Sequence, residues 1–393
     1  MKTMKWKFYS LAFVAGMSIL TACSSDDNND NDGNGGNGNG NEIENGTILK
    51  GTITSDVTLA AGNTYKLSGE YIVEEGATLH IEEGVKIIAV YDDIADYILV
   101  KQGGKITAVG TPDKPIVMTS EKEEPGAWGG IHICGRAHTN AEGGKGSSEI
   151  GGAVYGGNDD ADNSGTLQYI RLEYTGFAFD EEHEANGISF YGVGNGTIVD
   201  HCQAYKGSDD GFEFFGGSVN VSNLVAVSCS DDSFDWTEGW NGKGTNLVAY
   251  QEDKSTLGYD CDCLMECDNN GSNNAATPVA HPVLKNLILV GNGGSKQGIR
   301  LRAGTEVEID NAKVCGKGQP LTVETALTEN ALKNGTSKLT NITLTSELSS
   351  KEGIYTHADF IAVTSNKVDA NLSYSSFEDI RKECSWMNGS WVK

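Results

Sequence analysis

The chain has 393 residues, a formal net charge of -26, 51 glycines and only 6 prolines. This negative charge argues against nucleic acid and anionic lipid as binding partners, because both are polyanions, and it favours cations or neutral and basic ligands. The glycine content is high and follows no collagen triplet, so a collagen-like fibre is excluded.

Residues 1–22 predict a secretory signal. Lysines at three of the first seven positions precede an apolar run at 8–20, which is too short to span a membrane. The run ends in small residues before Cys23, and this ending resembles the lipobox of bacterial lipoproteins. The resemblance implies cleavage before Cys23 and an anchor in outer-membrane lipid through its sulfur. An ordinary secretory signal that happens to be followed by cysteine is the alternative.

Residues 23–45 predict a flexible tether. They are rich in Asn, Asp and Gly, and such a tract cannot bury apolar surface. An acidic run directly behind a lipidated cysteine resembles the signal by which Bacteroidetes send lipoproteins to the outer face of the outer membrane. We therefore expect a lipid-anchored protein that faces the cell exterior.

From residue 46 onward the pattern predicts β-strands. Apolar and polar residues alternate, and glycines stand at the expected turns. The segment 139–165 lacks this alternation and predicts a loop that leaves the main fold, and 264–274 predicts another. A short helix is expected within 322–338. The final stretch, 377–391, is expected to cap the end of the fold with two tryptophans.

The stretch 198–253 repeats one phrase. Asp209-Asp210 is followed by Phe212-Glu213-Phe214, and Asp231-Asp232 is followed by Phe234-Asp235-Trp236. The two copies are 22 residues apart, and the lead-in at Asn223 returns 23 residues later at Asn246. Glu252-Asp253 falls near the place of a third acidic pair.

This repeat predicts a single right-handed parallel β-helix over residues 46–393. A unit of 22 residues cannot bury its own apolar face, so each copy must pack on its neighbours, as in a solenoid. The aromatic residues stand two positions apart with an acidic residue between them, which is the alternation of an extended chain. Coils of about 22–24 residues, three short strands each, and long side loops are expected.

Several phrases carry a resemblance to a known family. Trp128-Gly129-Gly130, Phe215-Gly216-Gly217, Gly239-Trp240 and Gly298–Arg302 occur in order along the chain. They resemble the pectin-lyase-like β-helices of exported bacterial proteins. The resemblance implies the fold over most of the mature chain, but no single activity for the family as a whole.

The acidic phrases predict a metal site. Equivalent residues of successive coils lie about 4.8 Å apart, and two carboxylates at ~5 Å repel by roughly 3 kcal/mol at an effective dielectric near 20. A hard cation with several oxygen ligands, above all calcium, would relieve this repulsion. The alternative is that these residues form turns by accepting backbone N–H bonds. The predicted ligands are Asp209, Asp210, Glu213, Asp231, Asp232 and Asp235.

A catalytic interpretation uses the same region. Polygalacturonases and pectate lyases share this solenoid, and glycoside hydrolysis needs two carboxylates that flank the scissile bond. The catalytic candidates are Asp210, Asp232 and Arg300. The chain lacks the His-Gly pairing and the Arg-x-Lys phrase of polygalacturonases, which counts against a hydrolase.

Aromatic and basic residues suggest a ligand-binding face. We expect Trp236 and Trp240 to form an exposed shelf for sugar rings, while Arg300 and Arg302 share a strand face and could hold an acidic sugar. Eight cysteines remain besides the one in the lipobox, and in an exported protein they predict disulfides, for example between Cys202 and Cys229.

Together these patterns predict a surface lipoprotein that binds an extracellular ligand, in particular a glycan, with calcium as an integral ion. A polysaccharide lyase or glycoside hydrolase that uses the Asp209–Asp235 region is the first alternative. A structural or adhesive surface protein without a small ligand is the second.

Overall fold

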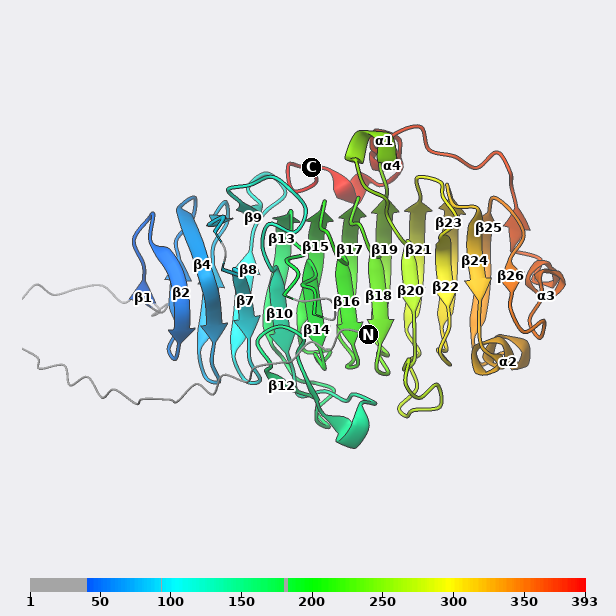
Figure 1. Ribbon diagram of the computed structural model, residues 1–393, viewed down its shortest axis with the longest axis horizontal. Helices are drawn as coiled ribbons and strands as arrows, with labels where there is room; N and C mark the ends of the chain where they lie inside the picture. The colour runs from blue at the N-terminus through cyan, green and yellow to red at the C-terminus, as the bar shows by residue number, and fades with distance from the viewer. Residues whose placement is uncertain (1–40, 93, 180–182) are drawn as a thin grey trace, which may run out of the picture. The chain divides into compact units, whose positions relative to one another are not determined.

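The computed structural model describes residues 41–92, 94–179 and 183–393, which wind into a right-handed parallel β-helix. Successive strands lie side by side along its long axis (Figure 1). The predicted signal, Cys23 and the tether up to residue 40 lie outside the described residues. Within the described part of the chain, no helix has both the length and the apolar character needed to cross a membrane.

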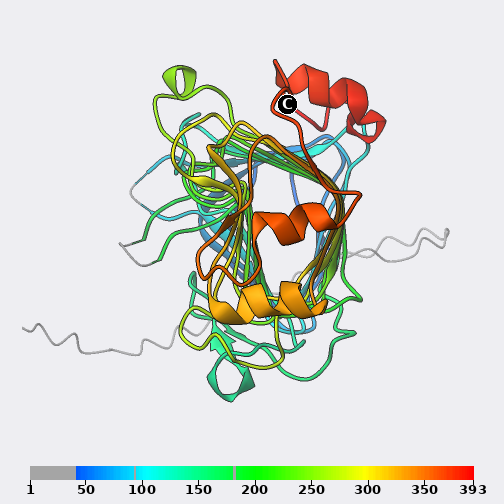
Figure 2. The ribbon, with the colours of Figure 1, turned by 90° about the vertical axis from the view of Figure 1, so that its right-hand side faces the viewer.

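Parallel strand pairing runs along three walls of the helix, and we call each wall a sheet. Figure 2 views the helix from its C-terminal end. We call the sheet that carries the acidic phrases the site sheet. Besides the second halves of two early strands, its strands are β7 (Tyr97–Val100), β10 (Ile131–Cys134), β14 (Ile188–Tyr191), β16 (Phe212–Phe215), β18 (Phe234–Thr237), β20 (Met265–Cys267), β22 (Gln297–Leu301), β24 (Gln319–Val323) and β26 (Ser349–Ser350).

The other two sheets share long strands that bend in the middle. These strands, with the short β27, are β13 (Gly165–Glu173), β15 (Ile198–Tyr205), β17 (Asn220–Val227), β19 (Lys243–Tyr250), β21 (Val283–Val290), β23 (Glu308–Cys315), β25 (Lys338–Leu344) and β27 (Lys367–Val368). The first coils are built from β1 (Asn41–Glu42), β2 (Ile48–Ile53), β3 (Val57–Leu59), β4 (Thr64–Val73), β5 (Thr78–Ile81), β6 (Lys86–Ala89), β8 (Lys105–Val109) and β9 (Ile116–Ser120). Strand β1 therefore lies within the segment expected to be tether.

The bend in the long strands depends on residues with a left-handed backbone. In five successive coils this residue is asparagine, with φ between 55° and 61°, a conformation that asparagine tolerates better than most residues. In the first four of these coils the asparagines bond to one another, because the Nδ2 of Asn246, Asn286 and Asn311 each donates to the asparagine Oδ1 of the preceding coil at 2.8–2.9 Å. We call this row the asparagine ladder. Its members are Asn223, Asn246, Asn286 and Asn311.

The interior of the helix is filled by stacked side chains in the predicted register. Phe212 pairs with Phe234, 22 residues later, and their rings stack with centroids 5.6 Å apart. Phe190 stacks on Phe214 in the same way at 5.1 Å. The residues between these aromatics point away from the core. The predicted coil length and alternation are confirmed.

Side loops and short helices project from the walls of the β-helix. The predicted loop at 139–165 is confirmed and contains a turn of 3-10 helix, η1 (Glu142–Gly144), and an antiparallel hairpin of β11 (Gly146–Ser147) and β12 (Val154–Tyr155). The predicted loop at 264–274 contains β20 instead at its start. Helix α1 (Lys254–Leu257) interrupts the repeat, and α2 (Ala326–Asn334) fits the predicted short helix.

The last residues do not cap the final coil, contrary to our expectation. Helix α3 (His357–Ala362) closes that end instead, with Phe360 fully buried against the core (Figure 2). The following chain, which includes α4 (Phe377–Glu383) and η2 (Ser385–Met387), returns along the outside of the helix. We call residues 377–393 the strap. Its end reaches early coils, where the backbone N–H of Ser390 donates to the oxygen of Pro112 at 2.8 Å.

Candidate metal centre

The turns before three strands of the site sheet place equivalent polar residues in a row. Asn186, Asp210 and Asp232 are each followed by one Gly or Ser, and the strand begins at the next residue. The backbone N–H of Asp210 donates to Asn186 Oδ1 at 3.2 Å, and that of Asp232 donates to Asp210 Oδ1 at 2.8 Å. The backbone N–H of Cys263 continues the row by donating to Asp232 Oδ1 at 2.6 Å. One oxygen of each aspartate is thus a turn former, as the alternative interpretation predicted.

Glycine lets these turns approach closely. A Cβ atom at Gly187 would lie 2.3 Å from the backbone oxygen of Gly211, and a Cβ at Gly211 would lie 2.6 Å from that of Ser233. Any larger residue would therefore push the coils apart. The glycines hold Asp210 and its neighbours at the spacing of the sheet.

In four successive strands of the site sheet, one residue that points away from the core is charged, and these residues form a column. Glu213 of β16 pairs with Asp235 of β18, which pairs with Glu266 of β20 and then with Arg300 of β22. The predicted adjacency of Glu213 and Asp235 is confirmed. The turn aspartates lie at one edge of this column.

The column and the turns border a cavity of about 210 Å³, which we call the acidic cavity. The site sheet contributes five carboxylates to its lining, and Glu149, Glu184 and Asn186 line it as well. Carboxylate oxygens of Asp210, Glu213 and Asp235 lie within 4.8 Å of one another. The same holds for Asp209, Asp210 and Asp231 at the edge of the cavity. The five carboxylates from the site sheet and its turns are Asp209, Asp210, Glu213, Asp231 and Asp235.

Burial and mutual repulsion hold protons on these groups. Burial, followed by the charge of Asp231, raises the pKa of Asp209 from 3.8 to about 8. Burial also raises the pKa values of Asp210 and Glu213 well above their usual range, and nearby carboxylates add to both shifts. The pKa of Asp231 rises to about 6 for the same two reasons. At neutral pH this cluster must therefore keep protons or bind another cation.

One coil further along, the same column carries its own cations. Arg300 bonds Glu266 at 2.8 Å, and Arg302 bonds Asp268 at 2.6 Å and also pairs with Glu266. By contrast, no lysine or arginine within residues 41–92, 94–179 and 183–393 forms an ion pair with Asp210, Glu213 or Asp235. Arg302 attracts Asp235 and Lys296 attracts Asp231 only at longer range, so the carboxylates of the acidic cavity lack the direct ion pairs of the neighbouring coil.

One oxygen of Asp235 has no partner. Its Oδ1 atom is shielded from solvent and makes no hydrogen bond in the structure. Asp235 belongs to two groups of converging carboxylates, one with Asp210 and Glu213 and one with Asp232 and Glu266. A buried oxygen without a donor is costly unless a cation or a proton serves it. The donor set consists of carboxylates, which suit a hard cation such as calcium.

The predicted aromatic shelf is wrong. Trp236 and Trp240 each expose only 1% of their surface and belong to the core. Trp240 stacks on Phe214 with ring centroids 4.2 Å apart, and its Nε1 donates to the oxygen of Val219. Its neighbouring glycines let the ring turn inward, so they do not mark an exposed position. Neither tryptophan can stack on a sugar at the surface.

Of the remaining predicted site residues, some lie where we expected and others do not. Arg300 and Arg302 lie on one face as expected, but both are engaged with acidic partners, Arg300 also with Glu324 at 3.2 Å. Asp210 and Asp232, the catalytic candidates, expose only 5% of their surfaces. Glu252-Asp253 is not the third acidic pair. Helix α1 is inserted there, and Asp262-Cys263 takes the place of the acidic pair, with the backbone N–H of Cys263 donating to Asp232 Oδ1, while Glu266 pairs with Asp235.

The predicted disulfides are also wrong for the described residues. The eight cysteines there are all buried and unpaired. Cys202 faces Leu224 in the next coil, which places it away from Cys229. These thiols serve as small apolar side chains of the walls, and burial raises the pKa of Cys229 to about 12.

Sequence reasoning missed three residues that line the acidic cavity. Glu149 comes from the loop at 139–165, and Glu184 comes from the segment before β14. Neither position follows the repeat, so no periodic signal marks them. Asn186 could have been found, because Asn186-Gly187-Ile188-Ser189-Phe190 matches the phrase that begins at Asp210. Its Nδ2 donates to Glu213 Oε2 at 2.5 Å.

Comparison with known proteins identifies the fold family. Residues 51–392 match the family described as a pectate-lyase-like β-helix domain. No curated protein and no solved structure matches the chain at a significant level.

Proposed function

The chain belongs to the pectate-lyase-like β-helix family, and we propose that it binds an extracellular glycan through a divalent cation held in the acidic cavity. A carbohydrate-related role agrees with the family. One observation supports the proposal of a bound cation. Several buried carboxylates converge on one cavity, and no lysine or arginine among the described residues forms an ion pair with Asp210, Glu213 or Asp235.

Calcium is the ion that this donor set favours. It takes six to eight oxygen ligands in flexible geometry, whereas magnesium demands a near-ideal octahedron. Asp210, Glu213 and Asp235 would hold the ion, and Asp209 and Asp231 would contribute from the edge of the cavity. The bound ion supplies positive charge and open coordination positions. Carboxylate or hydroxyl oxygens of a glycan would fill these positions, which overcomes the repulsion between an acidic glycan and this acidic chain.

The cellular setting is also a proposal. The basic, apolar and small-residue pattern of 1–22 supports export and lipid attachment at Cys23. The acidic residues that follow support display on the outer face of the outer membrane. A tethered β-helix at that position would present the acidic cavity to extracellular polysaccharide.

Titration calorimetry with hexagalacturonate tests the cation-dependent binding. We expect binding in calcium and none in protein stripped of metal. Asp235→Asn should weaken binding at least tenfold, because it removes a carboxylate that belongs to two of the converging groups. Glu347→Gln, which removes an exposed charge elsewhere, is the matched control and should bind like the unmodified protein. Equal binding with and without calcium would contradict the proposal.

A glycoside hydrolase is the second candidate, and the protonated state of the cluster favours it. A carboxyl whose pKa is about 8, as for Asp209, can act as a general acid at neutral pH. A lyase has less support, because Arg300 is engaged with Glu266 and Glu324. Product analysis after incubation with polysaccharides decides between binding and turnover. Turnover that Asp232→Asn abolishes would favour the enzyme, and intact polysaccharide throughout would leave the binding protein.

A further inference from the structure

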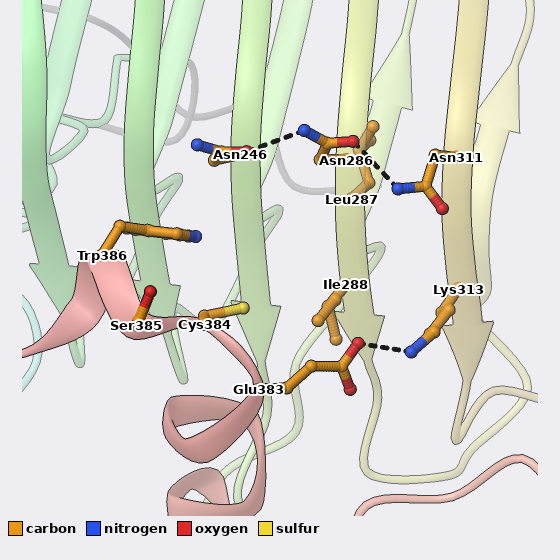
Figure 3. Close-up of a pocket in the computed structure, with 10 residues that line it drawn as sticks. All are labelled: Asn246, Asn286, Leu287, Ile288, Asn311, Lys313, Glu383, Cys384, Ser385 and Trp386. Atoms are coloured by element: carbon orange, nitrogen blue, oxygen red, sulfur yellow. Dashed lines mark hydrogen bonds and ion pairs between the residues drawn. The ribbon is translucent and has the colours of Figure 1, made fainter.

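A second cavity, of about 210 Å³, lies between the strap and the asparagine ladder (Figure 3). Its lining shares no residue with that of the acidic cavity, which lies on the site sheet. We call it the strap groove. Figure 3 shows the amides of Asn246, Asn286 and Asn311 in a row across neighbouring strands. Trp386 and Glu383 belong to the strap and line the groove from the other side.

Trp386 supplies an accessible aromatic surface. The other four tryptophans in the described part of the chain expose at most 1% of their surfaces, whereas Trp386 is partly exposed. It is held by neighbours that are themselves fixed: its ring centroid is 6.4 Å from that of His201 and 6.2 Å from that of Trp391. A rigid indole that reaches solvent is a suitable platform for the apolar face of a sugar ring.

The ladder supplies uncharged hydrogen-bonding groups. An asparagine amide carries two N–H donors and two acceptor lone pairs, and the ladder uses one donor and one lone pair of Asn246 and of Asn286. At the end of the row, Asn311 Oδ1 accepts no hydrogen bond from any described residue. The equivalent residue of the next coil, Asn341, donates instead to Asp310 at 2.6 Å. Donors and acceptors therefore remain for a ligand.

The charge of the groove favours a neutral ligand. Lys313 and Glu383 are paired with each other at one end, so they leave no net charge for an ion to neutralise (Figure 3). The amides recur with the spacing of the coils, about 4.8 Å. Linked pyranose rings repeat at a similar distance and present a hydroxyl-rich edge beside an apolar face.

We propose that the strap groove binds a neutral oligosaccharide. One sugar ring stacks on Trp386, and hydroxyl groups along the oligosaccharide bond to the amides of Asn246, Asn286 and Asn311. This inference rests on the proposed function for its ligand class, carbohydrate. It does not require the cation, because the groove contains no cluster of acidic residues. The protein would thus hold a glycan at two places with different chemistry.

Calorimetric titration of the full mature chain with cellohexaose, xylohexaose, maltohexaose and mannohexaose tests the groove. At least one of these neutral sugars should bind equally well with calcium and after metal removal. Trp386→Ala should weaken that binding at least tenfold, and Trp386→Phe should retain part of it. The sugar should also change the tryptophan fluorescence of the unmodified protein, because Trp386 is the accessible indole.

A matched pair of variants controls for stability. Asn311 and Asn341 both have a left-handed backbone, with φ of 61° and 56°, and glycine adopts this conformation readily. Asn311→Gly removes an amide from the groove and should weaken binding severalfold. Asn341→Gly removes the equivalent amide one coil away from the groove and should leave binding unchanged. This pair decides the matter even if Trp386→Ala disturbs the strap.

Two results would overturn the inference: no binding of any of the four sugars, or binding that is the same in Asn311→Gly and Asn341→Gly. Failure here is separable from failure of the proposed function. Calcium-dependent binding of hexagalacturonate that Asp235→Asn abolishes would stand without the groove. Conversely, calcium-independent binding of a neutral sugar would survive loss of the cation site.

Discussion

In metal-free protein the folding stability should depend strongly on pH. Asp209 has a pKa of about 8 in the folded chain against 3.8 for the free side chain. Between these two values the folded state keeps a proton that the unfolded state has lost. The stabilisation is complete at the acidic end of this range and is lost as the pH rises toward 8.

The loss of stability can be estimated because the folded state binds one more proton than the unfolded state at each such carboxyl group. From pH 5 to pH 7 the metal-free protein should lose folding stability on the order of 3 kcal/mol through Asp209 alone, because one bound proton is worth ~1.4 kcal/mol per pH unit. For about 350 folded residues this corresponds to roughly 4 °C in Tm. Asp210 and Glu213, whose pKa values are also raised, should enlarge the loss. Calcium at a hundred times its Kd should restore about 2.7 kcal/mol at pH 7.5.

Differential scanning calorimetry at pH 5, 6, 7 and 7.5, on metal-stripped protein with and without calcium, measures both effects. We expect calcium to raise Tm at pH 7.5 and to change it little at pH 5, where protons occupy the carboxylates. Asp210→Asn keeps the oxygen that accepts from Asp232 and removes the charge, so it should flatten the pH dependence. A metal-free Tm that does not fall between pH 5 and pH 7 would refute this reasoning.

Three further outcomes are expected. Trp240→Ala should destabilise the chain by about 3–5 kcal/mol in urea unfolding, because it empties a core position beside Phe214; an unchanged midpoint would contradict the buried position. Arg302→Gln should cost about 2–3 kcal/mol, since it leaves the buried carboxylate of Asp268 without its partner, and loss of less than 1 kcal/mol would argue against that pairing. Cys23→Ser should release the protein from membranes in fractionation, and retention with lipid would refute the proposed anchor.

The fold could be predicted from the sequence because a solenoid repeats the same sequence pattern in each coil. The 22-residue step between Asp209 and Asp231 sets the coil, and alternation sets which side chains point inward. The same rule failed at Glu252, because inserted residues around α1 break the step while the sheet continues at Glu266. The repeat length alone cannot show where inserted residues leave the β-helix between two coils.

The site was harder to predict because its parts come from different kinds of segment. Carboxylates on the walls follow the repeat, but Glu149 reaches the acidic cavity from a loop without periodicity. The orientation of Trp240 depends on a local turn, and its glycine neighbours suggest exposure although the ring packs on Phe214. Trp386 meets the asparagine ladder only because the strap returns along the helix, a path that no local pattern encodes.

A crystal structure of protein grown with terbium or calcium, with anomalous data, tests the central claim most directly. We predict an anomalous peak among Asp210, Glu213 and Asp235, with oxygen ligands at about 2.3–2.6 Å from calcium. Asp235 Oδ1 should be among these ligands. A cavity that holds only water in saturating calcium at pH 8, with Asp235 Oδ1 still unpartnered or bonded to a neighbouring carboxyl, would contradict the account.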